Sequence, residues 1–145
     1  MNETPAAGRS GPVRAGAVAA AGFVAISGFQ VALALGAPLG EAAWGGTHVH
    51  LPLGLRIASG FAAAFWILAA LVVFRRAGYR LSPVPVSVSR WGTWVLVGVL
   101  ALGALMNFAS SSPWERFLFG PVALLLALLC LVVARSEAER KVPAG

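Results

Sequence analysis

Charged side chains are scarce in this chain, and four long stretches of it contain none. Asp, Glu, Lys and Arg make up 11% of the 145 residues, against about 25% in an average soluble domain. The uncharged stretches, which also lack histidine, are residues 15–36, 57–74, 91–108 and 117–134. This shortage of charge excludes an ordinary soluble domain and favours a protein that lies in a lipid bilayer.

Cysteine and histidine are also few. Cys130 is the one cysteine, which excludes an internal disulfide framework and argues against redox chemistry at a thiol. His48 and His50 are the two histidines. In an extended segment they could bind one Zn²⁺ or Cu²⁺, with Glu41 or Glu115 as a third ligand. A tetrahedral site needs three or four ligands, and the chain offers no further His and no suitable Cys, so we expect neither a metal nor any other cofactor.

Each uncharged stretch is long enough to cross a membrane once as a helix. At about 1.5 Å per residue such stretches reach roughly 27–33 Å, close to the hydrocarbon thickness of about 30 Å. Inside lipid every backbone N–H and C=O needs an internal partner, and the alternating pattern of a membrane β-barrel is missing from the sequence. The sequence therefore predicts an all-α fold, an integral membrane four-helix bundle that forms one domain (15–134).

The basic residues predict which way the bundle faces. Arg56 and Arg116 lie in the loops 37–56 and 109–116, whereas the other basic residues flank the opposite ends of the stretches. The positive-inside rule then places both termini and the central loop in the cytoplasm, an N-in/C-in topology. The pI is 11.4, but the basic residues are divided among separate segments, so we expect no nucleic-acid partner. The cytoplasmic set is Arg9, Arg14, Arg75, Arg76, Arg80, Arg90, Arg135, Arg140 and Lys141.

The terminal segments and the composition complete this prediction. Residues 1–14 are rich in Gly, Pro, Ala and Ser and are predicted to be disordered in the cytoplasm, where residues 135–145 form a tail. The first stretch is longer than the roughly 7–15-residue core of a signal peptide, so we expect it to be retained. Arg outnumbers Lys, and Ala and Gly are abundant. We therefore expect a multi-pass protein of the bacterial cytoplasmic (inner) membrane.

Small and amide side chains within the stretches predict how the helices associate. Lipid does not drive helices together, so small residues at helical spacing favour close contact. An unpaired amide in lipid costs a few kcal/mol, so Gln30 and Asn107 should face the bundle and form hydrogen bonds there. Asn107 could instead line a pocket that opens outward. The expected small-residue contacts are at Gly28, Ala32, Gly36, Ser59, Gly60, Ala63, Ala64, Gly98, Ala101 and Gly103.

The shorter outer loop resembles a helix start. Ser112 is expected to cap the fourth helix, with Pro113 at its first position and Glu115 completing a capping box. Arg116 is expected to pair with Glu41 across the outer surface. In the longer loop Pro38 should end the first helix, while its tryptophan suits the headgroup level. The candidate ligand-binding or partner-binding residues are Glu41, Trp44, His48, His50, Arg56, Asn107, Glu115 and Arg116.

Two functional hypotheses are compatible with these features. The first is a small non-enzymatic membrane protein whose rigid bundle presents the outer loops to membrane lipid, a membrane protein partner or a second copy of the chain. The second is a small transporter or ligand-binding membrane protein with an outward-facing polar pocket beneath the 37–56 loop, floored by Asn107 and Gln30. An enzyme would have to use Glu115 and a histidine as acid and base. Without a recognisable nucleophile or metal triad, we expect a non-enzymatic protein.

Several short motifs resemble a known group of proteins. They are Gly-Ala-Pro-Leu-Gly at 36–40, Ala-Trp-Gly-Gly at 43–46, Leu-Pro at 51–52, Leu-Arg at 55–56, Leu-Met-Asn-Phe-Ala-Ser at 105–110, Glu-Arg at 115–116 and Pro-Val-Ala-Leu-Leu at 121–125. In these motifs the chain is similar to a broad group of small, uncharacterised bacterial four-helix membrane proteins. The resemblance implies the four-span topology and identifies the outer loops as shared features, with no reaction to carry over.

Overall fold

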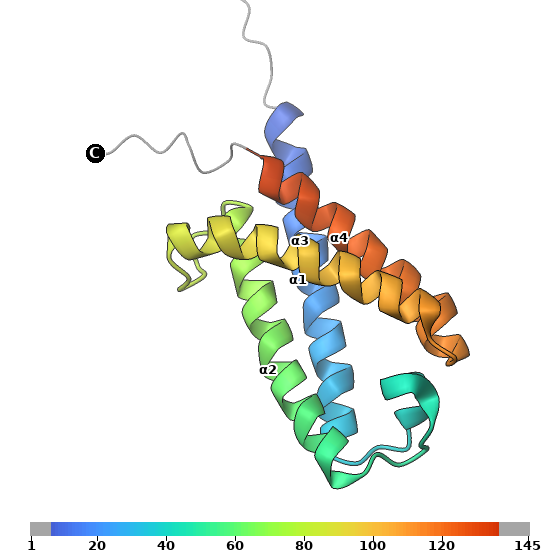
Figure 1. The fold of residues 1–145 in the computed structure, drawn as a ribbon. Coiled ribbons are helices and arrows are strands. Elements are labelled where there is room, and N and C mark those ends of the chain that lie inside the picture. Colours follow the sequence, from blue (N-terminus) through green and yellow to red (C-terminus); the bar gives the residue numbers. More distant parts are fainter. Residues whose placement is uncertain (1–6, 137–145) are drawn as a thin grey trace, which may run out of the picture.

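The computed structural model describes residues 7–136, with side chains from Ser10 onward, and this part of the chain is built from helices (Figure 1). The long helices are α1 (Ala7–Ala34), α2 (Leu53–Arg76), α3 (Val86–Ala109) and α4 (Gly120–Arg135). The short ones are the 3₁₀ turns η1 (Gly40–Ala42) and η2 (Trp44–Gly46) and the π-helical turn η3 (Glu115–Phe119), which leads into α4. Within the described residues, four helical segments are long and apolar enough to cross a membrane, which confirms the predicted all-α membrane fold.

Two helices, α2 and α3, extend beyond the apolar stretches of the sequence at both ends. α2 and α3 each begin directly after a proline, Pro52 and Pro85, so these prolines rather than hydropathy set the helix starts. α1 begins at Ala7, and residues 7–14 are helical where the sequence led us to expect disorder. Extending an existing helix costs far less than nucleating one, which explains why the helix continues through this segment. The remaining terminal predictions, for residues 1–6 and 137–145, lie outside the described residues.

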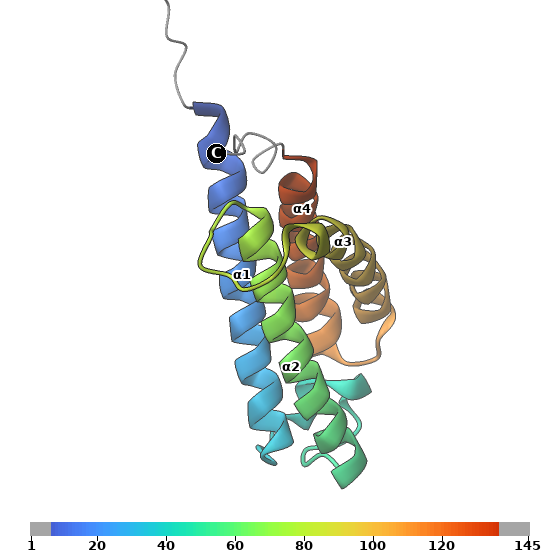
Figure 2. The ribbon, with the colours of Figure 1, turned by 90° about the vertical axis from the view of Figure 1, so that its left-hand side faces the viewer.

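The four helices form two antiparallel pairs, α1 with α2 and α3 with α4 (Figure 1). The pairs meet near the end of the bundle that holds residues 77–85 and Ser136, which we call the terminal end. At the opposite end, called the loop end, lie residues 37–52 and 110–112. Two perpendicular views show α2 and α3 diverging toward the loop end (Figure 1, Figure 2). The bundle is therefore closed at one end and wedge-shaped toward the other.

Helix packing is tightest in the terminal half of the bundle. Phe23, Val73, Cys130 and Val133 are fully buried there, in a core to which all four helices contribute. A second, smaller core at the loop end joins Leu33 of α1 to residues 43 and 51 of the loop. The main core therefore fixes how the helix pairs meet, and the small one attaches the loop to α1.

Three glycines allow the close helix contacts at the terminal end. A Cβ atom on Gly16 would lie 2.2 Å from the Cβ of Ala77, at the end of α2. One on Gly22 of α1 would lie 2.8 Å from a methyl group of Leu126 in α4, and one on Gly92 of α3 would lie 3.0 Å from a methyl group of Val72 in α2. Small residues thus join the helices, as expected in lipid.

The sequence nevertheless selected mostly the wrong glycines. In the described part of the chain a Cβ atom on Gly28, Gly60, Gly98 or Gly103 would meet nothing within 4 Å, whereas one on Gly36 would lie 3.2 Å from the guanidinium carbon of Arg56. Small residues recur on several faces of these helices, and the rotation of each helix, which the spacing alone does not fix, decides which of them meets a neighbour. The expected contact in α2 is realised through Ala63, whose carbonyl oxygen accepts a hydrogen bond of 2.9 Å from the Ser27 hydroxyl.

We predict that Gly16→Ala destabilises the bundle by roughly 1–3 kcal/mol, the usual cost of overpacking. The added methyl group would overlap Ala77 at the point where two backbones approach. Unfolding of the purified chain in mild detergent, followed by circular dichroism, measures the difference. Gly98→Ala is the matched control, because its new methyl group meets open space and alanine favours helix over glycine by about 1 kcal/mol. Equal stability of the two variants would contradict the proposed contact.

Candidate functional site beneath the loop-end cap

Residues 37–52, which we call the cap segment, cover the loop end of the bundle. α1 ends at Ala34, and Gly36 follows with a φ of +94°, the left-handed conformation that glycine adopts readily. The Gly36 N–H donates to the Leu33 carbonyl and the Ala37 N–H to the Ala32 carbonyl, both at 3.0 Å. This Schellman arrangement ends the helix, and the predicted stop at Pro38 follows it rather than causing it.

Arg56 fixes the start of the cap segment. Its Nε donates a hydrogen bond of 3.0 Å to the Ala34 carbonyl, at the C-terminus of α1. A guanidinium at this place satisfies a carbonyl that has no partner inside the helix and favours the negative end of the helix dipole. The sequence placed Arg56 among the binding candidates, whereas the structure gives it a capping role between α1 and α2.

Trp44 has an unusual backbone conformation within the cap segment. Its φ of +54° is positive, which is rare for a bulky residue and is typically found at functional sites and clamps. The indole Nε1 donates a hydrogen bond of 3.0 Å to the Ser59 hydroxyl on α2. Gly45 and Gly46 follow with φ of +83° and +72°, forming the tight turn that the sequence indicated. The turn directs the Trp44 ring across the loop end toward α2.

The cap segment is also attached to the α3–α4 turn. The Gly45 N–H donates a hydrogen bond of 3.1 Å to Oε1 of Glu115, and the Ser110 hydroxyl donates to the other carboxylate oxygen. The Ser112 hydroxyl donates to the Glu41 carbonyl at 2.8 Å. Glu115 and Ser112 therefore connect the two helix pairs through the cap segment.

These bonds correct two predictions about the α3–α4 turn. Pro113 is the first helical residue, as expected. Ser112 and Glu115 do not form a capping box, because both side chains are engaged by the cap segment and Ser110. The Arg116 guanidinium donates a hydrogen bond of 2.7 Å to the Ser110 carbonyl, and the pair expected between Arg116 and Glu41 is not formed in the described part of the chain.

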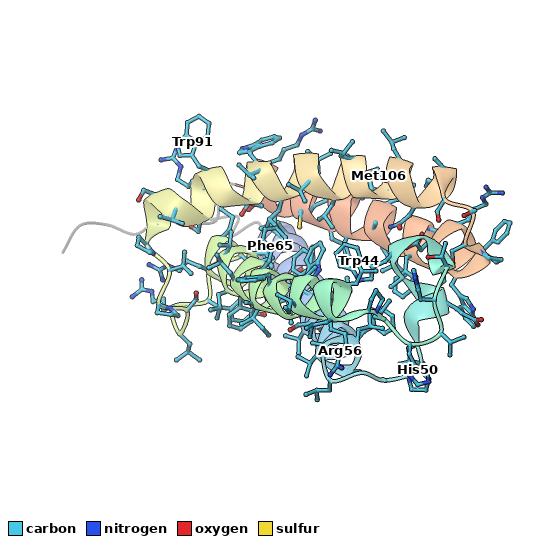
Figure 3. The ribbon with its side chains drawn as sticks, turned by 60° about the horizontal axis from the view of Figure 1, so that its bottom comes forward. Trp44, His50, Arg56, Phe65, Trp91 and Met106 are labelled. Atoms are coloured by element: carbon cyan, nitrogen blue, oxygen red, sulfur yellow. The ribbon has the colours of Figure 1, made fainter. Side chains whose placement is uncertain are left out.

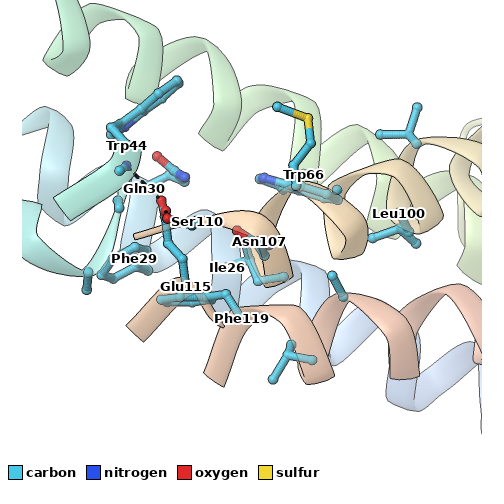
Figure 4. A pocket seen from close by; sticks show the side chains of 18 of the residues that line it. Ile26, Phe29, Gln30, Trp44, Trp66, Leu100, Asn107, Ser110, Glu115 and Phe119 are labelled. Atoms are coloured by element: carbon cyan, nitrogen blue, oxygen red, sulfur yellow. Dashed lines mark hydrogen bonds between the residues drawn. The ribbon is translucent and has the colours of Figure 1, made fainter. Parts of the chain in front are cut away.

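A cavity of about 640 Å³ lies beneath the cap segment. Figure 4 shows Trp44, Gln30, Ser110 and Glu115 gathered at one end of it and Trp66 and Leu100 at the other. All four helices contribute to its wall, which is apolar toward Trp66 and polar beneath the cap. The lining residues are Ile26, Phe29, Gln30, Ala42, Ala43, Trp44, Gly45, Trp66, Val99, Leu100, Gly103, Met106, Asn107, Ser110, Ser111, Glu115, Phe119, Val122 and Ala123.

Gln30 presents an unsatisfied acceptor at this cavity. Its Oε1 is buried and has no hydrogen-bond partner in the described part of the protein, so the expected interhelical hydrogen bond of this oxygen is not formed. An acceptor left in that state costs about 1–3 kcal/mol. Such a group is an exception among buried polar atoms and calls for an explanation, which a bound hydrogen-bond donor would supply.

The structure brings together part of the predicted site. Trp44, Asn107 and Glu115 line the cavity. Glu41, His48 and His50 are exposed outside it, and Figure 3 shows His50 and Arg56 on the side of α2 away from Trp44 and Phe65. The described residues contain no group of three His, Cys, Asp or Glu side chains that could hold a metal. The His48 ring nitrogen Nδ1 lies 2.7 Å from the neighbouring Thr47 hydroxyl.

Sequence reasoning missed the aromatic wall of the cavity. Phe29 and Phe119, from α1 and η3, approach with ring centroids 5.3 Å apart, and Trp66 stacks on Phe23 at 5.4 Å. No signal separates these rings from lipid-facing aromatic residues, because both kinds lie in uncharged stretches. Gln30 was detectable, since it is a rare amide within a span.

No family model, curated protein or solved structure matches this chain. The resemblance of its loops to a group of bacterial membrane proteins therefore stays a prediction, and functional inference depends on the geometry of the cavity.

We predict that Glu115→Ala loosens the cap segment. The variant removes both hydrogen bonds to the carboxylate, and hydrogen bonds to charged groups contribute about 1.5–3 kcal/mol each. Hydrogen exchange at residues 40–49, followed by mass spectrometry in detergent micelles, should become at least about tenfold faster. Glu41→Ala is the control, since the exposed Glu41 joins the α3–α4 turn through its backbone carbonyl. If exchange is unchanged in Glu115→Ala, the carboxylate does not hold the cap.

Proposed function

We propose that this chain is a small ligand-binding membrane protein, of the carrier or transporter class, whose ligand occupies the cavity beneath the cap segment. The cavity carries this proposal. Its volume of about 640 Å³ lies within the range of about 300–1,000 Å³ typical of small-molecule sites. An apolar wall with a few convergent polar groups is also typical of such sites. Of the two sequence-based hypotheses, these features favour the pocket over loop display.

The polarity of the cavity favours an amphipathic ligand. Phe29, Trp66 and Leu100 would surround an apolar body, while Gln30 and Glu115 beneath the cap would orient a polar end. The unsatisfied Gln30 oxygen supports this assignment, because a ligand donor would remove the cost of its burial. Nothing in the proposal requires bond making or breaking, and we propose a non-enzymatic protein.

We also propose that the loop end faces the outside of the bacterial cytoplasmic membrane. Arg75, Arg76 and Arg135 lie in the last turns of α2 and α4, at the terminal end. Arg80 and Arg90 flank the same end in sequence. The positive-inside rule assigns an end with that excess of arginine to the cytoplasm. The pocket would then receive its ligand from the outer leaflet or the external solution.

Display of the cap segment to a partner is a second candidate. The side chains of Glu41, His48 and His50 are exposed on a segment that is attached at both edges. A rigid exposed loop suits recognition by a membrane protein, a second copy of this chain or lipid headgroups. Under this alternative, His48→Ala with His50→Ala would abolish partner capture and leave the contents of the cavity unchanged.

Filling the cavity tests the proposed function. In Gly103→Trp the new ring would occupy the cavity, because Gly103 lines it and a Cβ atom there meets no neighbour. Native mass spectrometry of the chain, purified in mild detergent, should show a bound small molecule or lipid whose occupancy falls at least about tenfold in this variant.

Gly98→Trp is the control for that measurement. It adds the same side chain one helical turn or more away on α3, at an exposed glycine that does not line the cavity. The control should retain wild-type occupancy. Full occupancy in Gly103→Trp would show that the bound molecule lies elsewhere and would refute the pocket proposal.

The proposed orientation predicts one-sided labelling. In a Cys130→Ser background, Thr47→Cys in the cap segment should react with a membrane-impermeant maleimide added to intact spheroplasts. Arg80→Cys, between α2 and α3, should react only after the membrane is permeabilised. Both native side chains are exposed, so access to the reagent depends on sidedness. The reverse pattern would place the loop end in the cytoplasm.

A further inference from the structure

The polar end of the cavity contains a carboxylate, that of Glu115, which forms no ion pair in the described part of the chain. Glu115 is half-buried, and its carboxylate accepts hydrogen bonds from two neutral donors, the Gly45 N–H and the Ser110 hydroxyl. The guanidinium of the next residue, Arg116, donates to the Ser110 carbonyl, and that of Arg56 donates to the Ala34 carbonyl on the other side of α2 (Figure 3). Neutral donors stabilise a carboxylate without cancelling its charge, and a carboxylate has about four acceptor positions. Glu115 can therefore accept further bonds from a cation.

The other groups around this charge also suit a cation that carries N–H groups. The Gln30 Oε1 is a buried acceptor to which no described residue donates a hydrogen bond. Phe29 and Phe119 line the same cavity, and aromatic faces attract ammonium groups. Within the described part of the chain, no Lys, Arg or His lines the cavity. A phosphate or carboxylate headgroup would meet Glu115 and no cationic side chain of the described cavity wall, so the chemistry selects for ammonium and against an anion.

The cavity reaches the surface of the bundle between α2 and α3. To the cavity wall α2 contributes Trp66, and α3 contributes Val99 and Met106, whose side chains are 40% and 66% exposed. The two helices diverge toward the loop end (Figure 1, Figure 2). Figure 3 shows Trp44 and Phe65 in the space between their ribbons. Val99 and Met106 are apolar and lie on a membrane-spanning helix, so this side of the cavity faces the lipid, whereas the exposed lining residues Trp44 and Ser111 belong to the loop end.

We propose that the occupant is an amphiphile with a primary ammonium group, which enters from the membrane between α2 and α3. This inference rests on the proposed function and specifies its ligand. The ammonium group binds Glu115 and the Gln30 oxygen beneath the cap segment, and the apolar chain lies along Trp66 and Leu100. An aminolipid headgroup and a free long-chain amine share this chemistry.

Binding of defined amphiphiles to the full chain in phosphatidylglycerol nanodiscs tests the proposal. The probes are dodecylammonium, its trimethylammonium analogue and dodecanoate. Isothermal titration calorimetry measures the binding of each. We expect saturable binding of dodecylammonium at one site and at least tenfold weaker binding of dodecanoate. Equal binding of the anion and the ammonium, or no saturable binding of either, would overturn the assignment.

Two variants separate the expected contacts. Glu115→Gln should weaken dodecylammonium binding at least tenfold, whereas Glu41→Gln, which removes an exposed charge outside the cavity, should leave it unchanged. Gln30→Leu leaves the hydrogen bonds that hold the cap segment intact and should weaken the binding of dodecylammonium at least fivefold. It should leave the binding of the trimethylammonium analogue unchanged, because that probe has no N–H group. Equal loss for both probes in Gln30→Leu, or unchanged binding in Glu115→Gln, would refute the proposed contacts.

The source of the ligand is tested with dioleoyl lipids. If the ligand is an aminolipid, native mass spectrometry should show that phosphatidylethanolamine displaces phosphatidylglycerol with the same acyl chains. If the protein binds these two lipids equally and dodecylammonium displaces both, the site is assigned to a free amine. Retention of an anionic or uncharged molecule that Gly103→Trp expels would refute the ammonium assignment while supporting the pocket itself. If no bound molecule is found in any of these measurements, both the ammonium assignment and the proposed pocket are refuted.

Discussion

Close contact between the two helix pairs at the terminal end is the constraint on which the rest of the structure depends. Gly22 brings α1 against Leu126 of α4, and Gly92 brings α3 against Val72 of α2. Helices that touch at one end and are inclined to each other must separate toward the other end. The space between them is then too wide for the side chains of the spans to fill. The cavity is therefore a geometric result of tight packing elsewhere, and the cap segment covers it.

Hydrogen bonding explains how a loop of mixed polarity can lie at that opening. Backbone groups near lipid need partners, and the cap segment obtains them from both helix pairs. Arg56 belongs to the first pair, while Ser112 and Glu115 belong to the segment that leads into the last helix. The strained Trp44 backbone is held in place by these attachments and by its own bond to Ser59. Gln30 is left out of this network, and its buried Oε1 has no hydrogen-bond partner among the described residues.

The sequence predicted the architecture well and the site in part, for physical reasons. Uncharged stretches of membrane length reveal spans directly, because charge is costly in lipid. Helix ends at Leu53 and Val86 and the helical residues 7–14 depend on proline placement and helix propagation, which hydropathy does not report. Trp44, Asn107 and Glu115 were identified because polar or amphipathic residues near a loop are few. The aromatic wall was not identified, because helix rotation decides whether a ring faces lipid or a cavity.

The long sequence separation of the cap contacts has a consequence for how the molecule is assembled. Gly45 and Glu115 are 70 residues apart, and Glu41 and Ser112 are 71 apart. Chains are synthesised from the N-terminus and begin to fold in that order. The first helix pair, including the Arg56 bond to Ala34, can therefore form before the second pair has left the ribosome. Until then the cap lacks its anchors on one side, so the cavity beneath the cap segment is the last part of the protein to be completed during biogenesis.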